Sequence, residues 1–236
     1  MRQIAISDIH GCIKTFEALL DIVKLTAVDE LYLLGDYIDR GAHSKEVIDK
    51  IWALQAAGYQ VHCLRGNHEE LLLHARQEQL TPWLTWLHNG GDMTMRSFGL
   101  DPEAPPDCIP SKYLDFLEHL PYYFETDAYF LVHAGLDFRL PNPMEGKNAM
   151  LWIRDWYGNL DKSWLNGRII VHGHTPLFRP MIQHQLNHLD DFPVIDIDAG
   201  CVFGNMYLNH LCAFDLTNRQ LYFQKNIGHH GQAEYS

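Results

Sequence analysis

Apolar residues in the first third of the chain form short runs, and each run is followed by a polar loop. The runs, whose length and composition predict buried strands, span residues 2–7, 30–34 and 60–64. Behind each loop, apolar positions recur at helical spacing and predict helices at about residues 12–25, 44–58 and around 71–73. Strands that alternate with helices indicate an α/β core whose post-strand loops gather at one edge of a sheet.

The pattern is less regular further along the chain. The pattern predicts a helix at residues 81–88 and a short helix that starts at Ser111 and ends before Pro121. We expect these helices to form a small insert at about 78–121 within a single domain spanning 1–236. The second half is rich in β-structure, with a predicted hairpin at 122–132. Further strands are predicted at 168–171, 194–198, 208–216 and 221–225, and a frayed tail at 228–236.

The composition of the chain excludes several classes of function. The chain has 236 residues and a net charge of −12, which argues against general affinity for nucleic acid or for anionic membranes. No apolar run approaches the roughly 20 residues of a membrane span, and residues 1–8 lack the apolar region of a signal peptide. We therefore expect a cytoplasmic protein, with its five scattered cysteines reduced.

Polar side chains gather where predicted strands end. These residues are Asp8, His10, Asp36, Asp39, Asn67, His68, His133 and His174. Mixed oxygen and nitrogen ligands suit Mn²⁺, Fe or Zn²⁺. The two carboxylates of residues 35–41 (GDYIDRG) need a counter-charge if buried, so we expect Asp36 to bridge two divalent ions in a phosphate-cleaving site.

The same residues carry a resemblance. Residues 7–11 (SDIHG), 35–41 and 65–69 (RGNHE) resemble the three signature motifs of the phosphoprotein phosphatases, a family of calcineurin-like metallophosphoesterases. Residues 133–135 (HAG) and 173–175 (GHT) resemble its later metal-histidine motifs, and the match covers residues 4–215, most like bacterial and phage members. The resemblance implies a central β-sandwich of mixed sheets flanked by helices, with the site at the C-terminal ends of strands.

The resemblance also implies a role for each position. Asp8 and His10 would bind the first ion, Asp36 would bridge, and the second ion would be completed by Asn67, His133 and His174. His68 would be the general acid, oriented by Asp39, and a carboxylate there should raise the imidazole pKa. Arg40 and Arg154 would grip the phosphate. The cofactor would be two divalent ions, with Mn²⁺ favoured, and a metal-bridging hydroxide would attack in line.

We predict a serine/threonine protein phosphatase that acts on phosphorylated proteins or peptides, and also on phosphotyrosine and small phosphoesters. One alternative is a symmetrical diadenosine-tetraphosphate hydrolase. Such relatives typically carry Gln where His10 stands, so His10 favours the phosphatase. A nucleotide phosphodiesterase is a second alternative, and a non-catalytic phosphoprotein-binding scaffold is a remote one, because every expected ligand position is filled.

Overall fold

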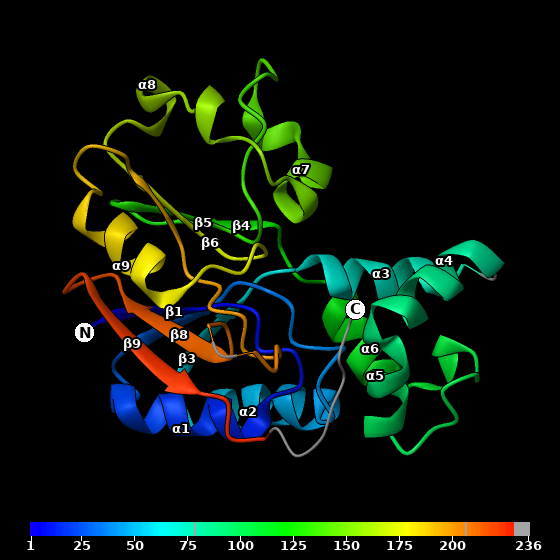
Figure 1. The fold of residues 1–236 in the computed structure, drawn as a ribbon. Helices are drawn as coiled ribbons and strands as arrows, with labels where there is room; N and C mark the ends of the chain where they lie inside the picture. The colour runs from blue at the N-terminus through cyan, green and yellow to red at the C-terminus, as the bar shows by residue number, and fades with distance from the viewer. Residues whose placement is uncertain (78, 206, 229–236) are drawn as a thin grey trace.

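Two β-sheets pack face to face at the centre of the molecule (Figure 1). The computed structural model describes residues 1–77, 79–205 and 207–228. The first sheet has the order β3-β2-β1-β8-β9, with strands Gln60–Cys63, Glu30–Leu33, Gln3–Ile6, His210–Asp215 and Gln220–Lys225. The second has the order β4-β5-β6-β7, with strands Tyr123–Glu125, Tyr129–Val132, Ile169–His172 and Val194–Asp196.

The strand directions place the predicted loops at one edge. Strands β1, β2 and β3 are parallel, and so are β5, β6 and β7, whereas β4, β8 and β9 run antiparallel to their neighbours. The predicted hairpin is confirmed, because β4 and β5 pair with Tyr123 opposite Val132. Parallel strands bring their carboxyl ends together, so the loops after β1, β2, β3, β5 and β6 can contribute to one site.

Three apolar layers hold the fold. One core fills the space between the sheets, where Leu131 and Val171 of the second sheet meet Ala5 and Phe214 of the first. A larger core lies between the first sheet and the helices below it in Figure 1, α1 (Ile13–Val23) and α2 (Ser44–Ala56). A third covers the outer face of the second sheet. The predicted α/β/β/α sandwich is therefore confirmed.

The remaining helices lie around the sheets. At the carboxyl end of β3 lies α3 (Asn67–Ala75). The range predicted as an insert holds α4 (Leu80–Trp86), a π-helical turn (Leu87–Gly91), α5 (Asp92–Ser97), a 3₁₀ turn (Pro106–Cys108) and α6 (Ser111–Glu118). The second half adds α7 (Lys147–Trp152), α8 (Lys162–Leu165), α9 (Arg179–Asn187) and 3₁₀ turns at Pro143–Glu145 and Tyr157–Asn159. Among the described residues no helix is both long and apolar enough to cross a membrane.

Helix α9 was not expected from the sequence. Only Ile182 is buried along it, so the apolar repeat that reveals a helix is missing. The sequence suggests that His184 and His188 are surface or loop residues. Both are exposed, on and just after this helix, and their rings stack 4.1 Å apart. The predicted frayed tail falls almost entirely outside the described residues.

Candidate metal centre

The loops after β1, β2 and β6 make unusually tight turns at the predicted site. Six residues of the site have a left-handed backbone with φ between 45° and 75°: Asp8, His10, Asp36, Asp39, Arg40 and His174. Side chains other than glycine disfavour this conformation, at a cost of about 1–2 kcal/mol per residue. Such local strain is tolerated where the surrounding structure fixes it, typically at functional sites.

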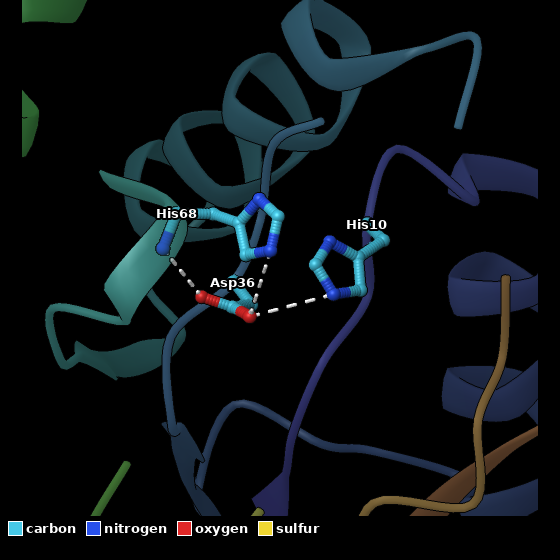
Figure 2. Close-up of side chains that lie close together, drawn as sticks. All are labelled: His10, Asp36 and His68. Atoms are coloured by element: carbon cyan, nitrogen blue, oxygen red, sulfur yellow. Dashed lines mark hydrogen bonds and ion pairs between the residues drawn. The ribbon is translucent and has the colours of Figure 1, made fainter. Parts of the chain in front are cut away.

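Asp36 lies at the centre of the site, and its carboxylate faces two histidines (Figure 2). Its Oδ2 lies 3.4 Å from Nε2 of His10 and 3.9 Å from Nε2 of His68. Its Oδ1 accepts a hydrogen bond from the backbone N–H of His68 at 3.0 Å, in the first turn of α3. Oδ2 therefore faces two imidazole nitrogens, while Oδ1 is held by the backbone of α3.

The ring orientation of two predicted ligands is fixed by the backbone. Nδ1 of His10 donates to the Ile38 carbonyl at 2.9 Å, and Nδ1 of His133 donates to the Leu34 carbonyl at 2.8 Å. Each Nε2 consequently carries a lone pair directed into the site. A carbonyl that holds the outer ring nitrogen is typical of histidines that bind metal through the inner one.

Asn67 joins the two later histidines. Its Oδ1 lies 2.8 Å from Nε2 of His133 and 2.8 Å from Nδ1 of His174. Because His133 donates through its other nitrogen, two lone pairs face each other at the Asn67 contact, and a cation between them would remove the repulsion. Oδ1 of Asp36 lies 3.5 Å from the same Nε2, so four predicted ligands of the second ion converge.

Asp8 approaches the same cluster from the loop after β1. Its carboxylate accepts hydrogen bonds from the Ser7 hydroxyl and, at 3.1 Å, from the backbone N–H of His174. Gly173 permits this approach, because a Cβ there would lie 2.1 Å from Asp8 Oδ2. Ligand atoms of Asp8, Asp36 and His133 lie within 4.8 Å of one another, as do those of His10, Asp36 and His68.

These observations fit a metal centre. The donor set combines carboxylate and amide oxygens with imidazole nitrogens, which suits Mn²⁺, Fe or Zn²⁺. Nε2 of His68 and Nε2 of His174 are both buried and have no hydrogen-bond partner among the described residues. Burial raises the pKa of Asp36 well above its usual value, and the negative charges of Asp8 and Glu69 add to the effect. A bound cation would reverse that penalty.

Glu69 braces the site from beneath. Its side chain accepts backbone hydrogen bonds from Asp36, Tyr37 and Gly66, each at 2.8 Å. These bonds tie the loop after β2 to the start of α3.

His68 and Asp39 form the predicted pair. Nδ1 of His68 lies 2.8 Å from Oδ2 of Asp39, so the ring is oriented with Nε2 toward Asp36. The expected rise in the imidazole pKa is not found. Burial is the largest cause that lowers the pKa of His68 well below its usual value, and the electrostatic effects of the nearby His10 and Arg40 add to it. Desolvation outweighs the neighbouring carboxylate because both groups are almost fully buried.

Two residues that hold Asp39 were missed by sequence reasoning. Nε1 of Trp86 donates to both carboxylate oxygens at 3.1 Å, and Oγ1 of Thr94 donates to Oδ1 at 2.6 Å. The sequence gave no reason to select either residue as a partner of Asp39. Burial raises the pKa of Asp39, and these two hydrogen bonds oppose that rise. The helical region 80–97 therefore completes the site rather than only covering it.

The two arginines differ in position. Nη1 of Arg40 donates to Nε2 of His10 at 3.0 Å, and its backbone N–H donates to the Gly90 carbonyl at 3.2 Å. Arg154 follows α7 and is exposed. Its positive charge contributes, after burial and His133, to lowering the pKa of His174 to about 2. Both guanidinium groups thus lie close to the histidine cluster.

A two-sheet sandwich with this cluster at its carboxyl edge defines a metallophosphoesterase. Residues 1–208 match the model of the calcineurin-like phosphoesterase family, and the chain belongs to that family. Metal-dependent hydrolysis of phosphate esters is the activity of this class.

The chain is also similar to individual proteins of known sequence or structure. The asymmetrical bis(5'-nucleosyl)-tetraphosphatase PrpE of Geobacillus thermodenitrificans is 28% identical over 231 residues, covering 84% of this chain and 85% of its own length. The protein of the same name from Bacillus thuringiensis is 26% identical, covering 86% and 87%. A protein serine/threonine phosphatase from Saccharomyces cerevisiae superposes with a TM-score of 0.65 at 13% identity, covering 98% of this chain and 81% of its own. That last likeness concerns the fold alone.

Proposed function

We propose that the protein hydrolyses dinucleoside tetraphosphates asymmetrically, giving a nucleoside monophosphate and a nucleoside triphosphate. The observation that carries the substrate class is the similarity to asymmetrical tetraphosphatases along more than four-fifths of both chains. This similarity changes two expectations from the sequence, one about the substrate and one about the position of cleavage. Phosphoproteins become the second candidate, and asymmetrical cleavage replaces symmetrical cleavage among dinucleotide reactions.

The ion-binding residues would be Asp8, His10 and Asp36 for one ion and Asp36, Asn67, His133 and His174 for the other. Divalent ions held there activate water as a nucleophile and neutralise charge on phosphate oxygens. Mn²⁺ is the ion that we favour.

The chain's own residues would supply the rest of the chemistry. His68 directs Nε2 into the site and would donate a proton to the leaving oxygen, while Asp39 holds its other nitrogen. Arg40 and Arg154 would bind the phosphate chain through their forked donors. The backbone N–H of His68, already bonded to Asp36, fixes the acid beside the proposed bridging residue.

The second candidate is a phosphomonoesterase that acts on phosphoserine, phosphothreonine or phosphotyrosine in proteins. His10 favours it, because the resemblance to phosphoprotein phosphatases includes this residue. We expect neither nucleic-acid nor membrane binding, and the cytoplasmic location stays a prediction.

Steady-state kinetics with Mn²⁺ test the proposal. The substrates are diadenosine tetraphosphate, a phosphoserine peptide, a phosphotyrosine peptide and para-nitrophenyl phosphate. We expect the highest kcat/KM for the dinucleotide, with AMP and ATP as products. Efficient turnover of phosphopeptides alone would establish the second candidate, and two molecules of ADP would restore the symmetrical alternative.

A further inference from the structure

A cavity of about 170 Å³ lies beside the metal centre, between the segment that follows α7, the end of β6 and helix α9. Its wall includes Ala134 and Thr175, which directly follow the predicted ligands His133 and His174. Arg154, a proposed phosphate ligand, lines it as well. A group held in this cavity would therefore sit immediately next to a phosphate bound at the metal centre.

One side of the cavity is apolar and aromatic. Trp156, Ile153, Leu177 and Met181 line it, with Trp156 2% exposed and Met181 50% exposed. The exposed methionine thus marks the outer rim and the tryptophan the floor. Flat apolar walls of this kind suit a heterocyclic base.

The other side is polar, with acceptors in fixed positions. Nδ1 of His172 donates to the Gly173 carbonyl at 2.9 Å, so its Nε2 accepts from the Tyr157 hydroxyl at 2.8 Å. The Gln185 side chain also interacts with the phenol oxygen, so this hydroxyl is fixed at the cavity wall. Asp196 also lines the cavity, and Gln185 accepts from its backbone N–H at 2.8 Å. Amino groups or ring N–H groups of a base are matching donors.

We propose that this cavity binds the nucleoside attached to the phosphate that is attacked. The inference rests on the proposed function and explains its asymmetry. If the phosphorus attached to a nucleoside reacts, its phosphate lies at the metal centre and the nucleoside lies directly beside it. The nucleoside subsite must therefore adjoin the metal ligands. The volume lies below the 300–1,000 Å³ of typical ligand pockets, so the cavity has room for the base of one nucleoside and not for a whole dinucleotide.

The reaction that follows from this placement is balanced by water alone. The water oxygen forms a bond to the phosphorus that carries the bound nucleoside, and the anhydride bond to the next phosphate breaks. The electron pair leaves with the triphosphate oxygen, which takes a proton from His68, and a proton released from the attacking water restores the one that His68 gave up. The product in the cavity is a nucleoside monophosphate.

The decisive variant is Met181→Trp, which fills the rim of the cavity from an exposed helical position. Ile22→Trp is the matched control, because Ile22 is 43% exposed on α1 and does not line the cavity. For Met181→Trp we expect AMP binding, measured by calorimetry on the full chain with Mn²⁺, to weaken about 10- to 100-fold. Kcat/KM for diadenosine tetraphosphate should fall by the same factor, and turnover of para-nitrophenyl phosphate should stay within about twofold.

A second variant, Tyr157→Phe, removes the hydroxyl and keeps the ring. It should weaken AMP binding about three- to tenfold. Hydrolysis in ¹⁸O-labelled water should place the label in AMP. Label in ATP would overturn the assignment of the attacked phosphorus.

The binding and turnover measurements separate the two proposals. If wild-type protein cleaves para-nitrophenyl phosphate but not the dinucleotide, the proposed function fails, whereas Met181-dependent AMP binding would still support the subsite. If Met181→Trp and Ile22→Trp bind AMP as tightly as wild type, the cavity is not a nucleoside site, whatever the substrate.

Discussion

The first sheet carries buried carboxylates at both of its ends, and their surroundings differ. At one end Asp29, just before β2, receives hydrogen bonds from the guanidinium of Arg2 at 2.7 Å and from the Thr26 hydroxyl at 2.8 Å. At the other end Asp36 faces histidines and lies near Asp8. The Arg2 hydrogen bond leads the effects that lower the pKa of Asp29 below its usual value, whereas burial raises that of Asp36.

The difference separates a structural carboxylate from a functional one. Asp29 already has its counter-charge, so it stabilises the fold. Asp36 lies where imidazole lone pairs converge and has no neighbouring cation equivalent to Arg2. Bound metal ions would compensate its buried negative charge. Four substitutions test this comparison.

The largest effect is expected for Asp36→Asn. Loss of the bridging carboxylate should empty or scramble both ion positions and lower kcat/KM by at least about 10³-fold, roughly 4 kcal/mol. Elemental analysis of bound metal is the measurement. In metal-free protein the free energy of unfolding should change by less than about 1 kcal/mol, because the change removes an uncompensated charge. Unchanged metal content would show that Asp36 is not the bridge.

His68→Asn should keep the metals and lower kcat by about 10²- to 10⁴-fold, or 3–5 kcal/mol. The loss should be greatest for alkyl phosphates such as phosphoserine, whose leaving oxygen needs a proton most. It should be smaller for para-nitrophenyl phosphate, whose leaving group is stable as an anion. Equal and small losses with both substrates would rule out His68 as the acid.

Asp29→Asn should lower the free energy of unfolding by about 1–3 kcal/mol at pH 7, with metal content unchanged. Because the folded-state pKa of Asp29 is depressed, its contribution is full above about pH 4 and disappears as the pH falls through the folded-state pKa. Denaturant unfolding of both proteins between pH 7 and pH 3 measures this. If the difference in unfolding free energy between wild type and Asp29→Asn grew toward acid pH, Asp29 would not be a stabilising carboxylate.

The smallest effect is expected for Trp86→Phe, which removes the N–H that holds Asp39 and keeps most of the packing. Kcat should fall about three- to tenfold, roughly 1 kcal/mol, with a shifted pH profile and unchanged metal content. Trp83→Phe is the control on the same helix, since its indole N–H has no partner among the described residues. If both variants behave alike, Trp86 acts through packing only.

Sequence reasoning located the elements well where apolar residues are periodic. It found the nine strands of the described residues and α1, α2 and α3, but it predicted no helix at α5, α7, α8 or α9. Along α9, Ile182 alone is buried. The residues that it selected as metal ligands lie close together in the structure, because the loops that carry them follow parallel strands.

The hydrogen-bond partners of those residues could not be predicted from the sequence. Trp86 and Thr94 lie 47 and 55 residues from Asp39, and nothing local marks them as its hydrogen-bond donors. The pKa of His68 was expected to rise and falls instead, since the depth of burial follows from packing.

The sequence by itself determined an α/β core, the order of the strands along the chain and the kinds of ligand at their ends, because hydrophobic periodicity and side-chain chemistry are local properties. The two-sheet sandwich was implied only by the resemblance to the phosphoprotein phosphatases. Tertiary structure decided which carbonyl fixes each histidine ring, what holds Asp39, and that a cavity lies beside His133 and His174. Those features are contacts between segments far apart in the chain, and they exist only once both sheets and their loops have packed together.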